Sequence, residues 1–199
     1  MLCRLFFRFH VYGVDNVPAE GPLLIISNHQ SFLDPVFCAV NVNRHLIFLA
    51  RDTLFKHRFF GRLISSVSAM PVRRGQADIK TIKTVIEKLR QGGAICLFPE
   101  GTRSSDGRIA AFKPGFGLLC RRSGAAIVPA VIDGAFEAWP KHKKMVSFGR
   151  KIVVCYGPVM PAEQVSKMDD RELAEQLTKT LRQMQNDCRL KHGKVPYVY

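Results

Sequence analysis

The 199-residue sequence has no apolar run long enough to cross a membrane. A spanning helix needs ~18–20 consecutive apolar residues, and every apolar stretch here is shorter. The first segment, MLCRLFFRFHVYGV, is interrupted by Arg4 and Arg8, so it lacks the form of a cleaved secretory signal. Its mixture of leucine, phenylalanine and arginine leaves two interpretations open. Residues 1–9 lie in a membrane interface, or they form an ordinary first helix or strand packed on the core.

Cysteine pairs at metal-binding or redox spacing are also missing. The six cysteines are scattered, with no C-x-x-C and no Cys/His cluster, so we do not expect a metal site. Cys38, Cys96 and Cys155 lie inside the apolar runs VFCAV, AICLF and IVVCY. This placement predicts reduced, buried thiols in a reducing compartment.

Several catalytic and binding motifs are absent as well. There is no G-x-S-x-G elbow and no Walker loop, and GFGLLC lacks the third glycine of a dinucleotide fingerprint. These absences argue against a serine hydrolase, a P-loop nucleotidase and a dinucleotide enzyme. The single Trp139 and the absence of an RNA-binding aromatic signature also argue against a nucleic-acid partner.

Acidic residues are scarce relative to basic ones. The chain has 16 Asp and Glu against 30 Lys and Arg, a formal net charge of +14. Folding does not require this excess, which indicates either an anionic partner or simple solubility. The candidate partners are nucleic acid, a phospholipid surface and a phosphorylated substrate. With 47% hydrophobic and 23% charged residues, the composition is that of a globular protein.

Short apolar runs alternate with helical patterns along the chain, which is typical of an α/β fold. We expect one domain over residues 1–199, with a central, mostly parallel (mixed) sheet flanked by helices. We expect strands at 23–27, 45–50, 68–75, 94–98 and 126–132, helices at 77–91 and 117–122, and a hairpin or strand pair at 145–157. An amphipathic helix is predicted over about 169–191, followed by a loosely ordered tail.

The segment NHQSFLD places His29 and Asp34 directly after the apolar run LLIIS. Functional groups of α/β folds gather at the carboxyl ends of buried strands, and we expect a helix that starts near Ser31. An aspartate bonded to one imidazole nitrogen fixes the tautomer and leaves the other nitrogen free to accept a proton. The alternative is a helix-capping aspartate beside a loop histidine. Spacing alone decides nothing, because His10 and Asp15 share it within a strand-and-turn pattern.

Basic and glycine-containing loops follow other predicted strands. In FPEGTRS, Gly101 permits a tight turn, Arg103 could hold a phosphate bidentately, and Glu100 could order Arg103 or meet a substrate hydroxyl. MPVRRG and FKPG add further cations, including Lys113 near a helix start. Each of these residues alone could be a solvated surface charge, but several strand ends together favour an anionic pocket.

Four ordered blocks carry a resemblance to a known family. NHQSFLD, SAMPVRRG, FPEGTRS and IVPAVI resemble, in this order, the motifs of the glycerolipid acyltransferases, best known through 1-acyl-glycerol-3-phosphate acyltransferase. The likeness covers about residues 9–160. It implies that His29 is the general base for an acceptor hydroxyl and that Asp34 orients it. The hydroxyl would then attack the thioester of acyl-CoA or acyl-carrier protein.

The resemblance also implies a substrate-binding set. It assigns the acceptor's glycerol phosphate to Glu100, Gly101, Thr102, Arg103, Arg74 and Lys113, with Arg73 an alternative to Arg74. Pro129 would shape the pocket near the acyl chain. No metal, no other cofactor and no covalent acyl-enzyme are implied.

The implied activity is acylation of a lysophospholipid, foremost 1-acyl-glycerol-3-phosphate to phosphatidic acid. Acylation of glycerol-3-phosphate or a lyso-amino-lipid, or a non-catalytic phospholipid-binding module, are the alternatives. Many family members carry a hydrophobic anchor before the first block, whereas here about twenty charged and apolar residues precede the strand at 23–27. We therefore expect peripheral attachment to the cytoplasmic face of an anionic membrane, in a bacterium.

Overall fold

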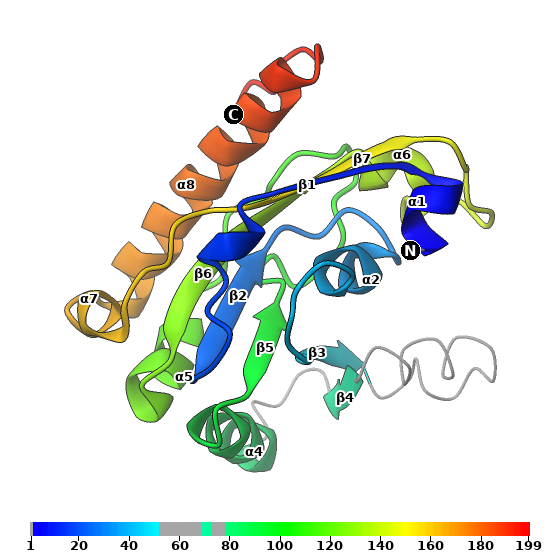
Figure 1. Cartoon of the computed structure of the whole chain (residues 1–199). Helices are drawn as coiled ribbons and strands as arrows, with labels where there is room; N and C mark the ends of the chain where they lie inside the picture. Colours follow the sequence, from blue (N-terminus) through cyan, green and yellow to red (C-terminus); the bar gives the residue numbers. More distant parts are fainter. Residues whose placement is uncertain (1, 52–68, 73–78) are drawn as a thin grey trace.

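The computed structural model describes residues 2–51, 69–72 and 79–199 (Figure 1). The strands are β1 (Arg8–Tyr12), β2 (Leu23–Ser27), β3 (Leu46–Arg51), β4 (Ala69–Val72), β5 (Ala94–Leu97), β6 (Ala126–Asp133) and β7 (Lys151–Tyr156). The helices are α1 (Leu2–Phe6), α2 (Asp34–Ala39), α4 (Ile79–Arg90), α5 (Phe116–Ser123), α6 (Ala135–Ala138), α7 (Ala162–Ser166) and α8 (Asp170–Lys191), with a short 3₁₀ turn, η1, at Val14–Asn16.

The strands form one sheet in the order β1-β7-β6-β2-β5-β3-β4. Neighbouring strands are parallel except β6 and β7, which are antiparallel. The run LLIIS forms β2, which pairs with β5 along one edge and β6 along the other. All five residues are buried; Leu23 and Ile25 belong to the core on one face of the sheet, and Leu24 and Ile26 to the core on the other. The carboxyl end of β2 therefore opens at the middle of the sheet, where α/β folds bind their ligands.

Helices pack on both faces of the sheet, and each face has its own core. On one face α1, α2 and α6 contribute Cys3, Phe37, Cys38, Ala135 and Ala138. On the other face, α4, α5, α7 and α8 cover the sheet with a larger set: Val85, Leu89, Phe116, Leu119, Cys120, Val165, Leu173, Leu177 and Leu181. Figure 1 shows α8 and α2 on opposite sides of the sheet. This arrangement confirms the expected mixed α/β domain and its C-terminal amphipathic helix.

The prediction of a hairpin or strand pair at 145–157 is wrong. Only Lys151–Tyr156 forms a strand. Both edges of β7 are already occupied, one by β1 in parallel and the other by β6 in antiparallel orientation. A local hairpin partner therefore has no edge to join. Residues 145–150 instead run beside α1, where the backbone N–H of Gly149 donates to the carbonyl of Phe6 over 2.8 Å.

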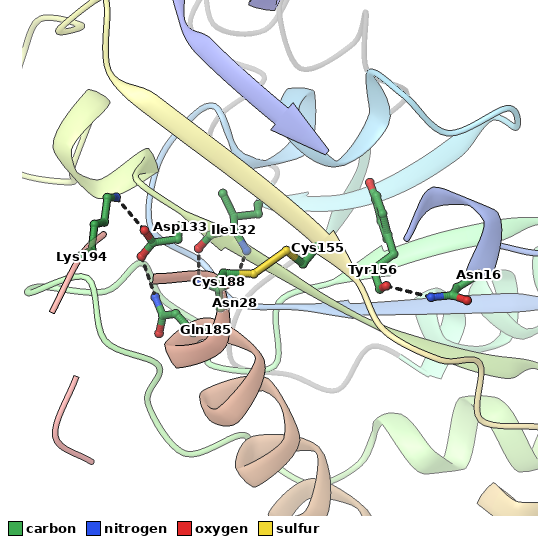
Figure 2. Close-up of a disulfide and its surroundings, with 9 residues drawn as sticks. All are labelled: Asn16, Asn28, Ile132, Asp133, Cys155, Tyr156, Gln185, Cys188 and Lys194. Atoms are coloured by element: carbon green, nitrogen blue, oxygen red, sulfur yellow. Dashed lines mark hydrogen bonds and ion pairs between the residues drawn. A yellow bond between two sulfur atoms is a disulfide. The ribbon is translucent and has the colours of Figure 1, made fainter. Parts of the chain in front are cut away.

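One cysteine prediction is also wrong. Cys38 and Cys96 are free and buried, as expected, but Cys155 on β7 pairs with Cys188 on α8 in a disulfide (Figure 2). Residues Ile152, Val154 and Tyr156 alternate with Cys155 and pack into the core on the α2 side of the sheet. Cys155 therefore points to the face covered by α8, a pairing that its apolar surroundings in the sequence could not reveal.

The C-terminal tail is not loosely ordered. Buried Asp133, at the end of β6, accepts from Arg189 on α8 over 2.9 Å. It also accepts from Lys194 in the tail over 2.6 Å, as Figure 2 shows. Asn186 exchanges two hydrogen bonds with the backbone of Tyr197. The hydroxyl of Tyr199 bonds the side chain of Gln185. These contacts fold residues 194–199 back along α8.

No helix in the described part of the chain combines the length and the apolar character that crossing a bilayer requires.

Candidate active site

The loop that carries His29 is fixed where β2 ends. The side chain of Asn28 donates to the carbonyl of Ile132 (2.9 Å) and accepts from its N–H (2.8 Å), so it bridges to β6 as a peptide group would. Figure 2 shows this bridge beside Asp133. Both groups are buried, where an unpaired amide would be costly. The bridge sets the direction in which the chain leaves β2 and so the position of His29.

His29 and Asp34 are bonded to each other. His29 Nδ1 lies 2.7 Å from Asp34 Oδ2. The same oxygen accepts from the backbone N–H groups of Gln30 and Ser31, each over 2.6 Å. Asp34 is fully buried, and 22% of the His29 side chain is exposed. Because two backbone N–H groups already donate to Oδ2, this oxygen acts as an acceptor toward the imidazole as well. Nδ1 therefore carries the proton, and Nε2 offers a lone pair.

The helix after this loop begins later than expected. We predicted a helix start near Ser31, but α2 begins at Asp34. Ser31 instead uses its hydroxyl to accept from the N–H of Leu33 (3.2 Å) and to donate to the carbonyl of Trp139 (2.9 Å). The extra turn of loop allows the carboxylate of Asp34 to reach back to His29.

The loop after β5 holds the other side of His29. The ring of Phe98 stacks on the imidazole with centroids 4.3 Å apart. The N–H of Ser104 donates to the carbonyl of His29 over 2.7 Å. The two blocks NHQSFLD and FPEGTRS thus meet at one edge of the sheet, as expected for loops that follow adjacent parallel strands. Phe98 belongs to a block that the sequence identified, but stacking cannot be inferred from spacing.

Glu100 makes contacts different from those expected of it. One carboxylate oxygen accepts from the N–H of His29 (2.7 Å), and the other accepts from the N–H of Ala110 (2.9 Å). Only 5% of the residue is exposed. Burial raises the pKa of Glu100 to about 7, against the opposing effect of the two backbone hydrogen bonds. These contacts tie the FPEGTRS loop to the backbone of the histidine.

We expect Glu100 to make stability fall with pH. Because its folded-state pKa is raised from 4.5 to about 7, the folded protein binds this proton more tightly than the unfolded chain does. The resulting contribution is fully present below pH 4.5 and is lost as the pH rises through 7, by at most about 3 kcal/mol. Denaturant unfolding of the wild type and Glu100→Gln between pH 5 and 8 measures it. If the difference between the two proteins did not change with pH, the assignment would fail.

Gly101 shapes a turn that allows Lys113 to approach. Its backbone has φ 71°, a conformation that favours glycine. A Cβ built there would lie 3.2 Å from the ammonium nitrogen of Lys113. The N–H of Gly101 donates to the carbonyl of Phe98 (3.0 Å), so this amide is used within the turn. The binding role predicted for Gly101 stays a prediction, and the turn places the cation of Lys113 beside it.

Arg103 is stacked on an aromatic side chain of the histidine segment. Its guanidinium carbon lies 3.3 Å from the centroid of the Phe32 ring. Phe32 in turn packs against Trp139, with centroids 4.9 Å apart. Such stacking pre-orients a guanidinium for planar, bidentate ligands. The stack brings Arg103 to the segment that carries His29. Residue spacing does not reveal this stack, because a helix that starts near Ser31 predicts an ordinary helical position for Phe32.

The remaining predicted residues are less informative. Thr102 is exposed on the same turn. Arg74 and its alternative Arg73 lie outside the described residues.

His10 and Asp15, which have the same spacing as His29 and Asp34, are arranged differently: no hydrogen bond joins them in the described part of the chain. The ring of His10, on β1, lies 5.2 Å from that of His192. Context, and not spacing, separates the two pairs.

Comparison with known proteins relates the chain to acyltransferases. A family model described as Acyltransferase matches residues 8–133. The chain is 26% identical over 180 residues to a 1-acyl-sn-glycerol-3-phosphate acyltransferase of Bacillus subtilis, covering 88% of this chain and 87% of that protein. It is 28% identical over 158 residues to a chloroplast 1-acyl-sn-glycerol-3-phosphate acyltransferase of Arabidopsis thaliana, covering 77% of this chain and 44% of that protein.

The chain matches only part of some relatives, and it shares its fold with a solved structure. The chain spans about half the length of the Arabidopsis thaliana and Brassica napus relatives, 44% and 46%. The crystal structure of PlsC, the 1-acyl-sn-glycerophosphate acyltransferase of Thermotoga maritima, has the same fold. It superposes with a TM-score of 0.75 at 23% identity, covering 90% of this chain and 71% of that one.

The family model covers more than half of the chain and includes both blocks that meet at His29. The chain therefore belongs to the acyltransferase family.

Proposed function

We propose that the protein transfers a fatty acyl group from an acyl thioester to the free hydroxyl of 1-acyl-glycerol-3-phosphate, giving phosphatidic acid. The observation that carries this proposal is the bond between His29 Nδ1 and Asp34 Oδ2, which leaves Nε2 as a proton acceptor on a partly exposed ring. Relatives named 1-acyl-sn-glycerol-3-phosphate acyltransferase support the choice of acceptor.

In the proposed reaction the acceptor hydroxyl gives its proton to Nε2 of His29 as its oxygen attacks the thioester carbonyl. A neutral hydroxyl is a poor nucleophile, so an oriented base is needed. The tetrahedral intermediate collapses when the carbon–sulfur bond breaks. The departing thiolate takes the proton back from His29, and Asp34 stabilises the imidazolium in between. Acyl-CoA or acyl-carrier protein is the co-substrate. The proposed steps need neither a metal nor another cofactor.

We assign the acceptor's phosphate to the cations beside the FPEGTRS turn. Arg103 offers a planar fork of donors, and Lys113 lies against Gly101 on the same turn. Arg74 remains a predicted member of this set. Glu100 has both oxygens on backbone amides. Its support for the proposal is therefore indirect, because it positions His29. We further propose that the enzyme works peripherally at the cytoplasmic face of a membrane that supplies the lysolipid.

The Arg103→Ala variant is expected to raise the KM for 1-acyl-glycerol-3-phosphate by tenfold or more and to leave the thioester KM within about twofold. Loss of one charge-assisted, bidentate contact to phosphate corresponds to roughly 1.5–3 kcal/mol. Steady-state kinetics with each substrate varied in turn measures the two constants. Arg171→Ala, an exposed arginine on α8, is the matched control. An equal rise in both constants would remove Arg103 from the phosphate site.

A panel of acceptors tests the substrate assignment. If glycerol-3-phosphate or a lyso-amino-lipid gave a higher kcat/KM than 1-acyl-glycerol-3-phosphate, the acceptor would have to be reassigned. If no acceptor released thiol from the thioester, the chain would instead be a phospholipid-binding module.

A further inference from the structure

The first helix and the segment before β7 lie side by side. Besides the bond from Gly149 to Phe6, the N–H of Arg8 donates to the carbonyl of Arg150 over 3.0 Å. The rings of Phe6 and Phe148 are 5.3 Å apart, and those of Phe7 and Phe148 are 5.9 Å apart. In Figure 1, α1 lies next to the yellow segment that connects α6 to β7. The two segments, distant in sequence, therefore form one surface.

Large apolar side chains are exposed on this surface. We define the apolar rim as Leu5, Phe6, Met145 and Phe148, whose exposed fractions are 78%, 43%, 80% and 62%. The opposite side of α1 is anchored in the core through Cys3, and Phe7, directly after the helix, is buried in the same core. Packing therefore does not account for the rim, since α1 already has a buried side. Clustered exposed apolar groups of this kind mark an interaction surface.

The rim is surrounded by positive charge. Its two segments carry six exposed basic side chains: Arg4, Arg8, Lys141, Lys143, Lys144 and Arg150. Neither residues 2–14 nor residues 138–162 contain an aspartate or glutamate. Phenylalanine and leucine surrounded by lysine and arginine are typical of segments that enter the headgroup region of an anionic bilayer. Lysine is depleted at protein–protein interfaces, which makes a protein partner a poorer match.

This surface is connected to the candidate active site. Trp139 is the first residue of the segment between α6 and β7, and its indole N–H donates to the carbonyl of Lys143 over 3.1 Å. The ring of Trp139 packs on Phe32, over which the guanidinium of Arg103 lies. These contacts join the segment that carries Met145 and Phe148 to Arg103, the arginine proposed to bind the acceptor's phosphate.

We propose that the apolar rim and its six basic neighbours form the docking face for an anionic phospholipid bilayer. The four apolar side chains enter the headgroup region, and the lysines and arginines contact lipid phosphates. The proposal rests on the proposed function in one respect, because it is the lysolipid acceptor that requires access to a membrane. It assigns docking to two segments acting together, residues 2–8 and 141–150, and not to the first nine residues alone.

Vesicle sedimentation tests the face directly. We expect the wild type to bind vesicles of phosphatidylglycerol and phosphatidylcholine and to bind pure phosphatidylcholine vesicles at least tenfold more weakly. Met145→Ser/Phe148→Ser should lower binding to the anionic vesicles about tenfold. The matched control is Leu190→Ser/Val198→Ser, which removes two apolar side chains that are 61% and 82% exposed elsewhere; it should bind as the wild type does. Equal binding by the rim variant and the control would overturn the proposal.

Charge reversal tests the electrostatic part. Lys141→Glu/Lys143→Glu/Lys144→Glu should abolish binding to anionic vesicles at physiological salt. The matched reversal Lys83→Glu/Lys167→Glu/Arg171→Glu changes the net charge equally at other exposed positions and should retain most of the binding. Equal losses in the two triple variants would show that overall charge, and not this face, directs binding.

Two further readouts separate this proposal from its alternatives. Activity toward a short-chain, monomerically dissolved 1-acyl-glycerol-3-phosphate should be the same for the rim variant and the wild type. Absence of that activity in both, with vesicle binding intact, would refute the proposed function and leave the docking face standing.

Sedimentation velocity without lipid should give the same oligomeric state for the wild type and the rim variant. A wild-type dimer that the rim variant dissociates would show that the rim binds a second copy, and would overturn the membrane assignment.

Discussion

Replacing His29 with alanine is expected to lower kcat by about 10²–10⁴-fold, the range typical for loss of a general base. Binding of lysolipid should survive, because the cations proposed for its phosphate, Arg103 and Lys113, are untouched. The hydrogen bonds that hold the loop use the backbone of His29, its N–H to Glu100 and its carbonyl to Ser104. They remain in the alanine variant, so the fold should be retained. Initial-rate kinetics and equilibrium binding of the lysolipid measure the two effects separately.

The chain contains its own control for this experiment. His10→Ala removes a histidine that has an aspartate at the same spacing, Asp15, but no hydrogen bond to it within the described residues. We expect its kcat to stay within about twofold of the wild type. Substantial turnover by the His29→Ala variant would refute the general-base assignment, and so would an equal loss in the His10→Ala variant.

Replacing Asp34 with asparagine is expected to have the second largest effect, a fall in kcat of about 10²–10⁴-fold. The amide oxygen can still accept from the N–H groups of Gln30 and Ser31, which preserves the shape of the loop. The charge that stabilises the imidazolium is lost. The constraint that keeps the proton on Nδ1 of His29 is lost with it. KM for both substrates should change little, because Asp34 is buried and away from solvent.

A structural explanation of the Asp34 effect has to be excluded. Circular dichroism and thermal unfolding of Asp34→Asn show whether the loop is retained, and Asp15→Asn is the matched control for a change of charge. If the Asp34→Asn variant kept a kcat within threefold of the wild type, Asp34 would be a capping residue only. That outcome would return the pair to the alternative that spacing alone left open.

Local sequence patterns predicted the parts of the fold that depend on near neighbours. The unbroken apolar run at 23–26 identified a strand buried on both faces, and this in turn placed His29 near a strand end. The amphipathic period of residues 170–190 identified α8, which begins at Asp170 and ends at Lys191. In both cases the signal is a periodicity of burial within one element, which a single sequence carries.

The errors share a physical cause, which is contact between segments that are distant in sequence. The expected hairpin does not form, because β7 lies between β1 and β6 and has no free edge. The pairing of Cys155 with Cys188 depends on which residue of α8 lies opposite β7. The tail appeared unstructured because its contacts are to Asp133 and α8, and not to its neighbours in the chain.

The candidate site was predictable as a set of residues but not as a set of contacts. The sequence predicted that His29, Asp34, Glu100, Gly101 and Lys113 follow strand ends at one edge of the sheet. It could not show that the carboxylate of Glu100 binds two backbone amides, or that the amide of Gly101 is used within its own turn. Hydrogen-bond partners of this kind depend on loop conformations, for which residue types and spacing give only weak constraints.

The most direct test mixes the purified protein with acyl-CoA and 1-acyl-glycerol-3-phosphate, and follows thiol release together with the mass of the lipid product. We expect equal amounts of free thiol and phosphatidic acid from the wild type, and neither from His29→Ala at the same enzyme concentration. Thiol release without an acylated lipid would contradict direct transfer to the acceptor. Phosphatidic acid formed at the wild-type rate by His29→Ala would contradict catalysis by the His29–Asp34 pair.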